Sequence, residues 1–317
     1  MNIVRKGTKP VVLINKHENG MEYLTFPSIT DTKIVSHAFS CRIGGASKGD
    51  FAESNFSFTR GDIRKDVEEN YRRMAQILGY GRSLEHFVTT FQTHTNNVRL
   101  VTSNDMGKGV CKDRDYVDID GMITNTPGII LTTFHADCPA IYLVDPLNKA
   151  IGLVHSGWKG TVERIGARTI EAMNREFETD PSNLICAIAP SICTDCYEVS
   201  SDVAEKFIEE FKIKEIPYYN PSIILPNTRS SSGENNDGEL IERERLPESH
   251  ILYQKRNGKY QLSLWEAIRT TLIQEGVLKE HITVTDICTH CNPDYLFSHR
   301  VQGKKRGNLA AFMVLNN

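Results

Sequence analysis

The stretch Gly128–Gly160, GIILTTFHADCPAIYLVDPLNKAIGLVHSGWKG, determines how the rest of the chain is organised. It contains three apolar runs of the length and composition that favour buried β-strands. These runs are Ile129–Phe134, Ala140–Val144 and Ile151–Val154. We therefore expect three neighbouring strands here, with the polar residues of the stretch collected where the strands end.

The polar residues of this stretch have the chemistry of a site. Pro139 and Gly157 are poor strand-interior residues and mark turns, so Cys138 and His155 should lie at strand ends. The backbone at such positions can hold a site in place. A thiol and an imidazole presented in this way can share a zinc ion or form a nucleophile and base pair. The stretch by itself leaves both options open.

The composition places the chain among soluble globular proteins. It has 317 residues, 39% hydrophobic and 24% charged, enough for one large domain or two of ordinary size. A net charge of -3 gives no case for nucleic acid or an anionic membrane as the main partner, and nothing indicates an oligomeric state. Because we find no charged-then-apolar leader and no run long enough to span a bilayer, we expect a reduced, cytoplasmic protein.

Strand-like and helix-like segments are mixed irregularly along the chain. Further strands are expected at Val11–Asn15, Met21–Phe26, Val35–Ser40, His86–Gln92, Val98–Val101, Leu184–Ala189, Ile282–Ile287 and Ala310–Leu315. Helices are expected at Asp62–Leu78, Ala167–Phe177, Ser200–Phe211 and Leu262–Glu275. With no repeat and no composition break, this order predicts one α+β domain over residues 1–317, with mixed β-sheets flanked by helices. The polar stretch Thr228–Ser249 predicts a mobile, variable surface loop.

His94, Cys138 and His155 form a candidate metal site. Each follows or ends a strand-like run and has small or turn-forming neighbours. Two imidazoles and a thiolate are a ligand set of the kind that catalytic zinc uses, with the fourth position left for water or substrate. The alternative is that they are separate polar residues at three strand ends. The set predicts a metal site only if the three side chains converge.

Two neighbours of Cys138 also carry suitable chemistry. His135 is the rival metal ligand, and we rank it below His94 and His155. Asp137 could orient a ligand imidazole or accept a substrate proton. Its ordinary interpretation is that of a turn residue shortly before Pro139.

A glycine turn with two cations follows the strand Val35–Ser40. The segment Ser40–Gly49, SCRIGGASKG, has free backbone N–H groups that can cradle an oxyanion, and Arg42 can pair with such an anion bidentately. A phosphate site is the functional interpretation, but the pattern alone ranks it below the alternative. The alternative is an ordinary glycine loop with a solvated arginine, because the spacing matches no strict phosphate-loop motif.

The remaining cysteine and basic motifs each have an ordinary interpretation. Cys193–Cys196 and Cys288–Cys291 are two CxxC pairs far apart in sequence, without knuckle glycines. Buried free thiols are the default expectation, and a structural four-cysteine zinc site is the alternative. The basic segment Ser298–Gly307 predicts solvated charge, with an anion-facing loop as the alternative.

Five blocks in a fixed order give the chain a resemblance to a known family. It is similar to the proteins once labelled multicopper polyphenol oxidases or laccase-domain proteins, now regarded as zinc-dependent purine nucleoside phosphorylases that also deaminate adenosine. The five blocks are His37-Ala38-Phe39-Ser40 with Arg42, Gly44, Gly45 and Ser47; Asn55-Phe56-Ser57; Gln92-Thr93-His94; Ala136-Asp137-Cys138-Pro139; and His155-Ser156-Gly157-Trp158-Lys159-Gly160. The end of the chain also fits the family, with Tyr197-Glu198-Val199, Cys288-Thr289, Phe297-Ser298, Arg300 and Arg306-Gly307.

The resemblance implies roles for residues of this sequence. It implies that the zinc ligands are His94, Cys138 and His155, which with Asp137 form the expected catalytic group. It also implies a substrate pocket that includes Arg42, Ser47, Asn55, Gln92 and Arg300. Three positions depart from the family's usual pattern: Thr95 replaces a common glycine, His135 a common threonine and His299 a common aromatic. The first two could change the shape or polarity of the pocket.

The function implied by the resemblance is phosphorolysis of adenosine, inosine, guanosine and, as a further candidate, methylthioadenosine. Phosphate held by the metal, Arg42 and the glycine turn would attack near C1′. For deamination, the same metal would lower the pKa of a bound water and direct it at C6 of adenine. The alternatives are a copper-dependent polyphenol oxidase, a cysteine hydrolase using Cys138 and His155, and a non-catalytic binding module.

Overall fold

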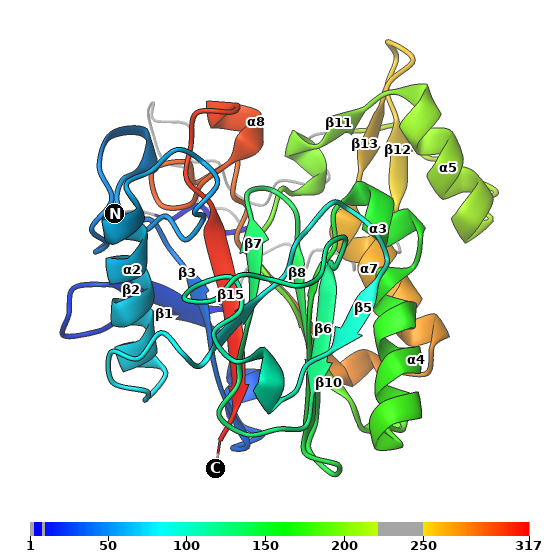
Figure 1. Ribbon diagram of the computed structural model, residues 1–317. Helices are drawn as coiled ribbons and strands as arrows, with labels where there is room; N and C mark the ends of the chain where they lie inside the picture. Colours follow the sequence, from blue (N-terminus) through cyan, green and yellow to red (C-terminus); the bar gives the residue numbers. More distant parts are fainter. Residues whose placement is uncertain (1–2, 8–9, 221–249, 317) are drawn as a thin grey trace, which may run out of the picture.

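Two six-stranded β-sheets packed face to face form the centre of the molecule. The computed structural model describes residues 3–7, 10–220 and 250–316. Helices lie on the outer face of each sheet, so the layers run helix, sheet, sheet, helix across the view in Figure 1. The mixed α+β architecture with helices flanking mixed sheets confirms the fold class expected from the sequence.

The first sheet has the order β1-β2-β3-β15-β7-β4. Its strands are β1 Leu13–Lys16, β2 Glu22–Thr25, β3 Val35–Ser40, β4 Phe87–Thr89, β7 Ile130–His135 and β15 Leu309–Leu315. All neighbours are antiparallel except β4, which runs parallel to β7. The C-terminal ends of β4 and β7 therefore lie at the same edge of the sheet.

The second sheet has the order β14-β10-β8-β9-β6-β5. Its strands are β5 Val98–Leu100, β6 Gly121–Thr124, β8 Ala140–Asp145, β9 Ala150–His155, β10 Ile185–Ile188 and β14 Ile282–Val284. Only the two edge pairs are parallel, β14 with β10 and β5 with β6. The three runs of the stretch Gly128–Gly160 are thus β7 in one sheet and the antiparallel pair β8 and β9 in the other.

Strands β8 and β15 are largely apolar because they are buried on both faces. Along β8, Tyr142 faces the core between the two sheets, whereas Ile141 and Leu143 face the helices outside. In β15, Met313 faces the same central core, whereas Phe312 faces the opposite side. Side chains alternate between the faces of a strand, so a strand covered on both sides favours apolar residues at successive positions.

Three long helices cover the outer faces. Their bounds are α2 Arg64–Ile77, α4 Ile165–Phe177 and α7 Leu264–Gln274. Tyr71 and Met74 of α2 pack on the first sheet, and Met173 of α4 and Leu272 of α7 pack on the second. These contacts are the apolar stripes of amphipathic helices.

A smaller unit lies at one end of the second sheet. It consists of the sheet β11-β13-β12 and helix α5, with its own apolar cluster (Figure 1). The bounds are β11 Glu198–Val199, β12 Leu252–Gln254, β13 Tyr260–Leu262 and α5 Ser201–Phe211. The remaining short helices are α1 Pro27–Thr30, α3 Trp158–Val162 and α8 His299–Gln302, with 3-10 turns η1 Gly49–Phe51, η2 Ser103–Asp105, η3 Pro181–Asn183, η4 Thr194–Cys196 and η5 Lys279–His281.

Every strand and helix expected from the sequence is found, with ends that differ by a few residues. The predicted loop Thr228–Ser249 lies outside the described residues. Among the described residues, we find no helix with the length and apolar character needed to cross a membrane.

Candidate active site

The two sheets bring three segments together at one edge. Strand β9 ends at His155, and antiparallel pairing places Ala140, the first residue of β8, directly opposite it. Cys138 comes two residues before Ala140, in the turn after β7. His94 follows β4, whose parallel pairing with β7 sends it to the same edge. The topology thus gathers three residues that are well separated in sequence.

The side chains of His94, Cys138 and His155 converge. Each offers one ligand atom, and these three atoms lie within 4.8 Å of one another. The two imidazole rings are nearly perpendicular, with centroids 5.0 Å apart. His155 is buried and His94 is exposed, so the group opens to solvent on one side. The predicted convergence is therefore present in the geometry, and the residues form a group that could hold a metal ion.

A buried carboxylate that the sequence did not single out organises this group. Asp120 Oδ1 lies 2.7 Å from His155 Nδ1, and its carboxylate also accepts the backbone N–H groups of Thr93, His94 and Thr95 at 3.0–3.1 Å. Because an ionised carboxylate only accepts hydrogen bonds, His155 donates from Nδ1 to Asp120, which leaves Nε2 as the nitrogen that faces Cys138. Asp120 directly precedes strand β6, and its contact with His155 follows from the pairing of β6 with β9.

The cysteine and histidine shift each other's pKa. Burial acts to raise the pKa of Cys138, but the adjacent His155 and hydrogen bonds from His155 and His94 outweigh burial and lower it to about 6. Burial acts to lower the pKa of His155, whereas Cys138 and Asp120 raise it to about 9. Without metal, therefore, the pair favours a thiolate beside an imidazolium.

The rival ligand His135 has both ring nitrogens engaged elsewhere. Its Nε2 lies 2.7 Å from Thr133 Oγ1, and its Nδ1 lies 3.0 Å from the carbonyl oxygen of Cys138. Burial and the nearby His155 hold its pKa well below the ordinary value, so the ring is neutral. His135 therefore supports the turn that carries Cys138, in keeping with its lower rank as a ligand.

Asp137 connects the Cys138 turn to the turn at Thr289 and to helix α8. Its Oδ1 accepts a hydrogen bond from Thr289 Oγ1 at 2.6 Å, and its Oδ2 accepts from the backbone N–H of Arg300 at 2.7 Å. Its backbone has φ +84, a conformation that non-glycine residues seldom adopt. Both carboxylate oxygens of Asp137 thus accept hydrogen bonds that attach these two segments to the turn beside Cys138.

Gly157 leaves the space that the side chains of His94, Cys138 and His155 need. A Cβ at this position would lie 2.8 Å from His94 Cδ2, 3.2 Å from Cys138 Sγ and 3.5 Å from His155 Cε1. Its φ of -68 is available to any residue, so space rather than backbone freedom requires glycine here. This accounts for the glycine of the His155–Gly160 motif.

The three candidate ligands lie at the wall of a cavity of about 430 Å³. Gln92 lines the same cavity, and its amide pairs with the backbone of Phe134 at 2.6 and 2.8 Å. The cavity is also lined by three aromatic rings and three guanidinium groups that the sequence did not assign to it. These residues are Phe58, Phe91, Phe134, Arg60, Arg114 and Arg306.

Arg306 is the most unusual of these arginines. Its side chain is 5% exposed, and its Nε has no hydrogen-bond partner. Burial and the neighbouring charge of Arg60 lower its pKa to about 10, despite the opposing attraction of Asp137 and Cys138. In the basic segment Ser298–Gly307, Lys304 and Lys305 are exposed as solvated charge would be, whereas Arg306 faces the cavity.

Four predicted substrate residues lie outside the residues that line this cavity. Arg42 donates to the carbonyl oxygens of Ala52 and Pro293, and Ser47 accepts from Asn70. The side chain of Arg300 reaches the carbonyl oxygen of Glu198. Their roles in substrate binding stay predictions.

Asn55 forms hydrogen bonds with two residues that line the cavity. Its Oδ1 accepts the backbone N–H groups of Ser57 and Asn308 at 3.0 and 2.9 Å, and both of these residues line the cavity. Asn55 is fully buried. Direct substrate contact by Asn55 likewise stays a prediction.

Comparison with known proteins identifies relatives along most of the chain. The purine nucleoside phosphorylase YlmD of Geobacillus stearothermophilus is 32% identical over 271 residues, which span 85% of this chain and 86% of that protein. The purine nucleoside phosphorylase YlmD of Bacillus subtilis is 29% identical over 287 residues, 89% of each chain.

Solved structures share the fold. The crystal structure of YlmD from Geobacillus stearothermophilus matches with a TM-score of 0.78 and 28% identity, covering 98% of this chain and 100% of that chain. The sequence model of a family described as multi-copper polyphenol oxidoreductase laccase matches residues 36–224 and 237–316. Because that match spans most of the chain, this protein belongs to the multi-copper polyphenol oxidoreductase laccase family, together with relatives named purine nucleoside phosphorylase.

Proposed function

We propose that this chain is a zinc-dependent purine nucleoside phosphorylase that also deaminates adenosine. One observation carries the proposal: His94, Cys138 and His155 converge at the wall of a cavity that also contains the buried guanidinium of Arg306 with an unpartnered Nε. A group that could hold a metal ion and a guanidinium that could bind an anion thus face the same space. The names of the relatives support the phosphorylase part of this proposal.

The three candidate ligands fit a zinc ion. Zinc takes imidazole nitrogen at about 2.0–2.1 Å and thiolate sulfur at about 2.3 Å, so tetrahedral ligands lie roughly 3.3–3.8 Å apart. The donor atoms of His94, Cys138 and His155 all lie within 4.8 Å. Asp120 fixes the tautomer of His155, as carboxylates behind zinc-bound histidines commonly do. When bound, zinc with three protein ligands would supply a Lewis acid able to polarise phosphate or activate water.

The arginines of the cavity would bind phosphate. Arg306 and Arg60 lie close enough for the charge of one to lower the pKa of the other, and such a pair is stabilised by an anion between them. Arg114 lines the same cavity. Guanidinium groups match phosphate oxygens bidentately, which would orient the attacking oxygen toward C1′ of the nucleoside.

The aromatic part of the cavity would hold the purine. Phe58, Phe91 and Phe134 line it, and Phe91 is 39% exposed, with the guanidinium of Arg114 over its ring at 4.8 Å from the centroid. Flat apolar rings suit a purine base by stacking. We propose adenosine, inosine, guanosine and methylthioadenosine as substrates, with phosphate as the second substrate.

The experiment is to incubate zinc-loaded protein with inosine or adenosine plus phosphate and separate the products by chromatography. The expected products are hypoxanthine or adenine together with ribose-1-phosphate. Inosine formed from adenosine without phosphate would report deamination. Unreacted nucleoside in every arm would overturn the proposal.

A cysteine hydrolase is the second candidate, because the lowered pKa of Cys138 and the raised pKa of His155 also describe a nucleophile and base pair. A thiol alkylator that inactivates the enzyme, combined with a chelator that does not, would favour it. A copper-dependent polyphenol oxidase would instead consume oxygen with a phenolic substrate and added copper. Metal binding without turnover of any nucleoside would indicate a binding module.

A further inference from the structure

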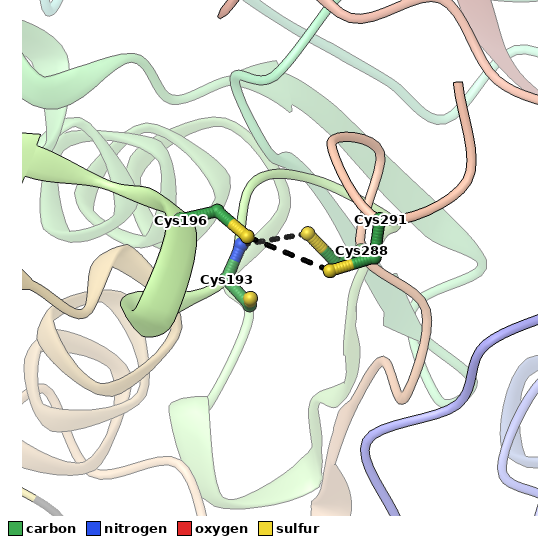
Figure 2. Close-up of side chains that lie close together, drawn as sticks. All are labelled: Cys193, Cys196, Cys288 and Cys291. Carbon is green, nitrogen blue, oxygen red and sulfur yellow. Dashed lines mark hydrogen bonds between the residues drawn. The ribbon is translucent and has the colours of Figure 1, made fainter. Parts of the chain in front are cut away.

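The two CxxC pairs, far apart in sequence, meet in space. Strand β10 pairs in parallel with β14, and an isolated bridge between Ser191 and Cys288 continues this pairing beyond both strands. Cys193 and Cys196 therefore lie beside Cys288 and Cys291. Figure 2 shows the four side chains directed toward one another, and we call them the four-cysteine cluster.

The spacing of the four sulfurs is that of ligands around one ion. All four lie within 4.8 Å of one another, and Cys196 Sγ lies 3.5 Å from Cys291 Sγ. Four sulfurs at about 2.3 Å from a central zinc would lie roughly 3.8 Å apart. A disulfide requires an S–S distance of about 2.05 Å, and all eight cysteines are free. Iron–sulfur clusters hold their cysteines around several iron atoms and need a wider arrangement.

The surroundings of the cluster suit thiolates. The backbone N–H of Cys193 donates to Cys288 Sγ at 3.2 Å, as backbone amides do to charged sulfur. Lys6 lies near Cys193 and Cys291 and is held by Asp195 at 3.1 Å. Four thiolates around one divalent cation leave a net negative charge, and the ammonium of Lys6 offsets part of it.

We propose that Cys193, Cys196, Cys288 and Cys291 bind a second, structural zinc ion. All four ligand positions are occupied by protein, so no position is left for substrate, as in other structural zinc sites. None of the four residues lines the cavity described above. This site is therefore separate from the group of His94, Cys138 and His155, and its existence does not depend on the proposed reaction.

The position of the cluster gives the ion a defined role. Ile192, next to Cys193, donates its backbone N–H to the carbonyl oxygen of Asp137 at 3.0 Å. Thr289, next to Cys288, donates its hydroxyl to Asp137 Oδ1 at 2.6 Å. The zinc ion would hold together the two loops that support Asp137, the neighbour of Cys138. It would thereby stabilise the turn that carries Cys138 in the candidate active site.

The test is the metal content of the protein purified without added metal. We expect two zinc ions per chain in the unaltered protein, and one in the double variant Cys196→Ser/Cys291→Ser. His94→Ala should also keep one ion, retained at the four-cysteine cluster. The control Cys111→Ser changes an exposed cysteine outside both groups and should keep two. A double variant with undiminished zinc content would overturn the proposal, as would iron in place of zinc.

A second measurement uses the unaltered protein and applies even if the double variant does not fold. The native protein is alkylated with and without a strong chelator, and the modified cysteines are mapped by mass spectrometry. We expect the four cysteines to react slowly until the chelator is added, whereas the exposed Cys111 reacts at the same rate in both conditions. Rapid alkylation of all four without chelator, or disulfides among them, would contradict a zinc site.

Discussion

Asp120 Oδ1 accepts a hydrogen bond from His155 Nδ1 across 2.7 Å, with both side chains almost fully buried. The same carboxylate holds the backbone N–H groups of Thr93, His94 and Thr95. One residue therefore fixes the ring orientation of one candidate ligand and the backbone position of another. This makes Asp120 the organising residue of the proposed zinc site.

We expect Asp120→Asn to weaken zinc binding roughly 10- to 100-fold, the usual effect of losing a partner behind a metal-bound histidine. The amide has one acceptor oxygen, so it cannot satisfy both His155 and all three backbone N–H groups. Zinc affinity measured by competition with a chromophoric chelator tests this. The control Asp118→Asn alters an exposed neighbour that contacts Thr93 but not His155. Equal affinities in the two variants would argue against a role for Asp120.

Gly157→Ala should impair zinc binding without unfolding the protein. The added Cβ would meet His94 Cδ2 at 2.8 Å and displace this ring from the group. We expect a loss of roughly tenfold or more in zinc affinity, comparable to other perturbations of ligand position. The control Gly166→Ala, in α4, meets its nearest neighbour, Leu272, at an ordinary 3.5 Å and should bind zinc normally. Isothermal titration of metal-free protein with zinc measures both, and wild-type affinity in Gly157→Ala would refute the steric argument.

Arg306→Lys should separate phosphate binding from nucleoside binding. Lysine keeps the charge but loses the bidentate geometry, so we expect the KM for phosphate to rise roughly 10- to 100-fold. The KM for inosine should change little, because the purine is assigned to the aromatic part of the cavity. Steady-state kinetics at varied phosphate provide the measurement. Lys305→Ala, an exposed neighbour, is the control. A rise confined to the KM for inosine would place phosphate elsewhere.

The sequence predicted the framework well because burial leaves a local signal. The strands β8 and β15 are buried on both faces, so their residues form unbroken apolar runs that can be recognised without any partner. Pro139 and Gly157 likewise mark turns that can be recognised from the neighbouring sequence alone. Cys138 and His155 could therefore be placed at strand ends before the sheets were known.

The rest of the site depends on contacts between distant segments, which leave no local pattern. In the sequence, Asp120 is one of several acidic residues, and its contact with His155 becomes apparent only when β6 is paired with β9. The sequence predicts that Arg306 belongs to a solvated basic segment, whereas the structure buries it. Arg42 has the more suggestive motif, but it is not among the residues that line the cavity, and its guanidinium donates to two backbone carbonyl groups. Convergence of the four cysteines likewise required the pairing of β10 with β14.

The free energy of unfolding should depend on pH through Asp105, which lies shortly before Gly109 in the chain. This buried carboxylate accepts hydrogen bonds from Lys108 Nζ at 2.8 Å, Arg99 at 2.9 Å and the backbone N–H of Thr102 at 3.0 Å. Burial acts to raise its pKa, but these partners outweigh burial and lower it to about 2. Gly109, next to Lys108, lines the cavity.

We expect Asp105→Asn to lower the free energy of unfolding by about 1–3 kcal/mol at pH 7, since it removes charge-assisted hydrogen bonds. A carboxylate whose pKa is depressed in the folded state contributes its full stability above its unfolded pKa, near 4. That contribution is lost as the pH falls from about 4 toward 2. The difference between the variant and the unaltered protein should therefore be smaller at pH 3 than at pH 7 in urea unfolding. Asp113→Asn, at an exposed position nearby, is the control and should show no such difference. A difference that stays constant between the two pH values would show that the charge of Asp105 does not stabilise the fold.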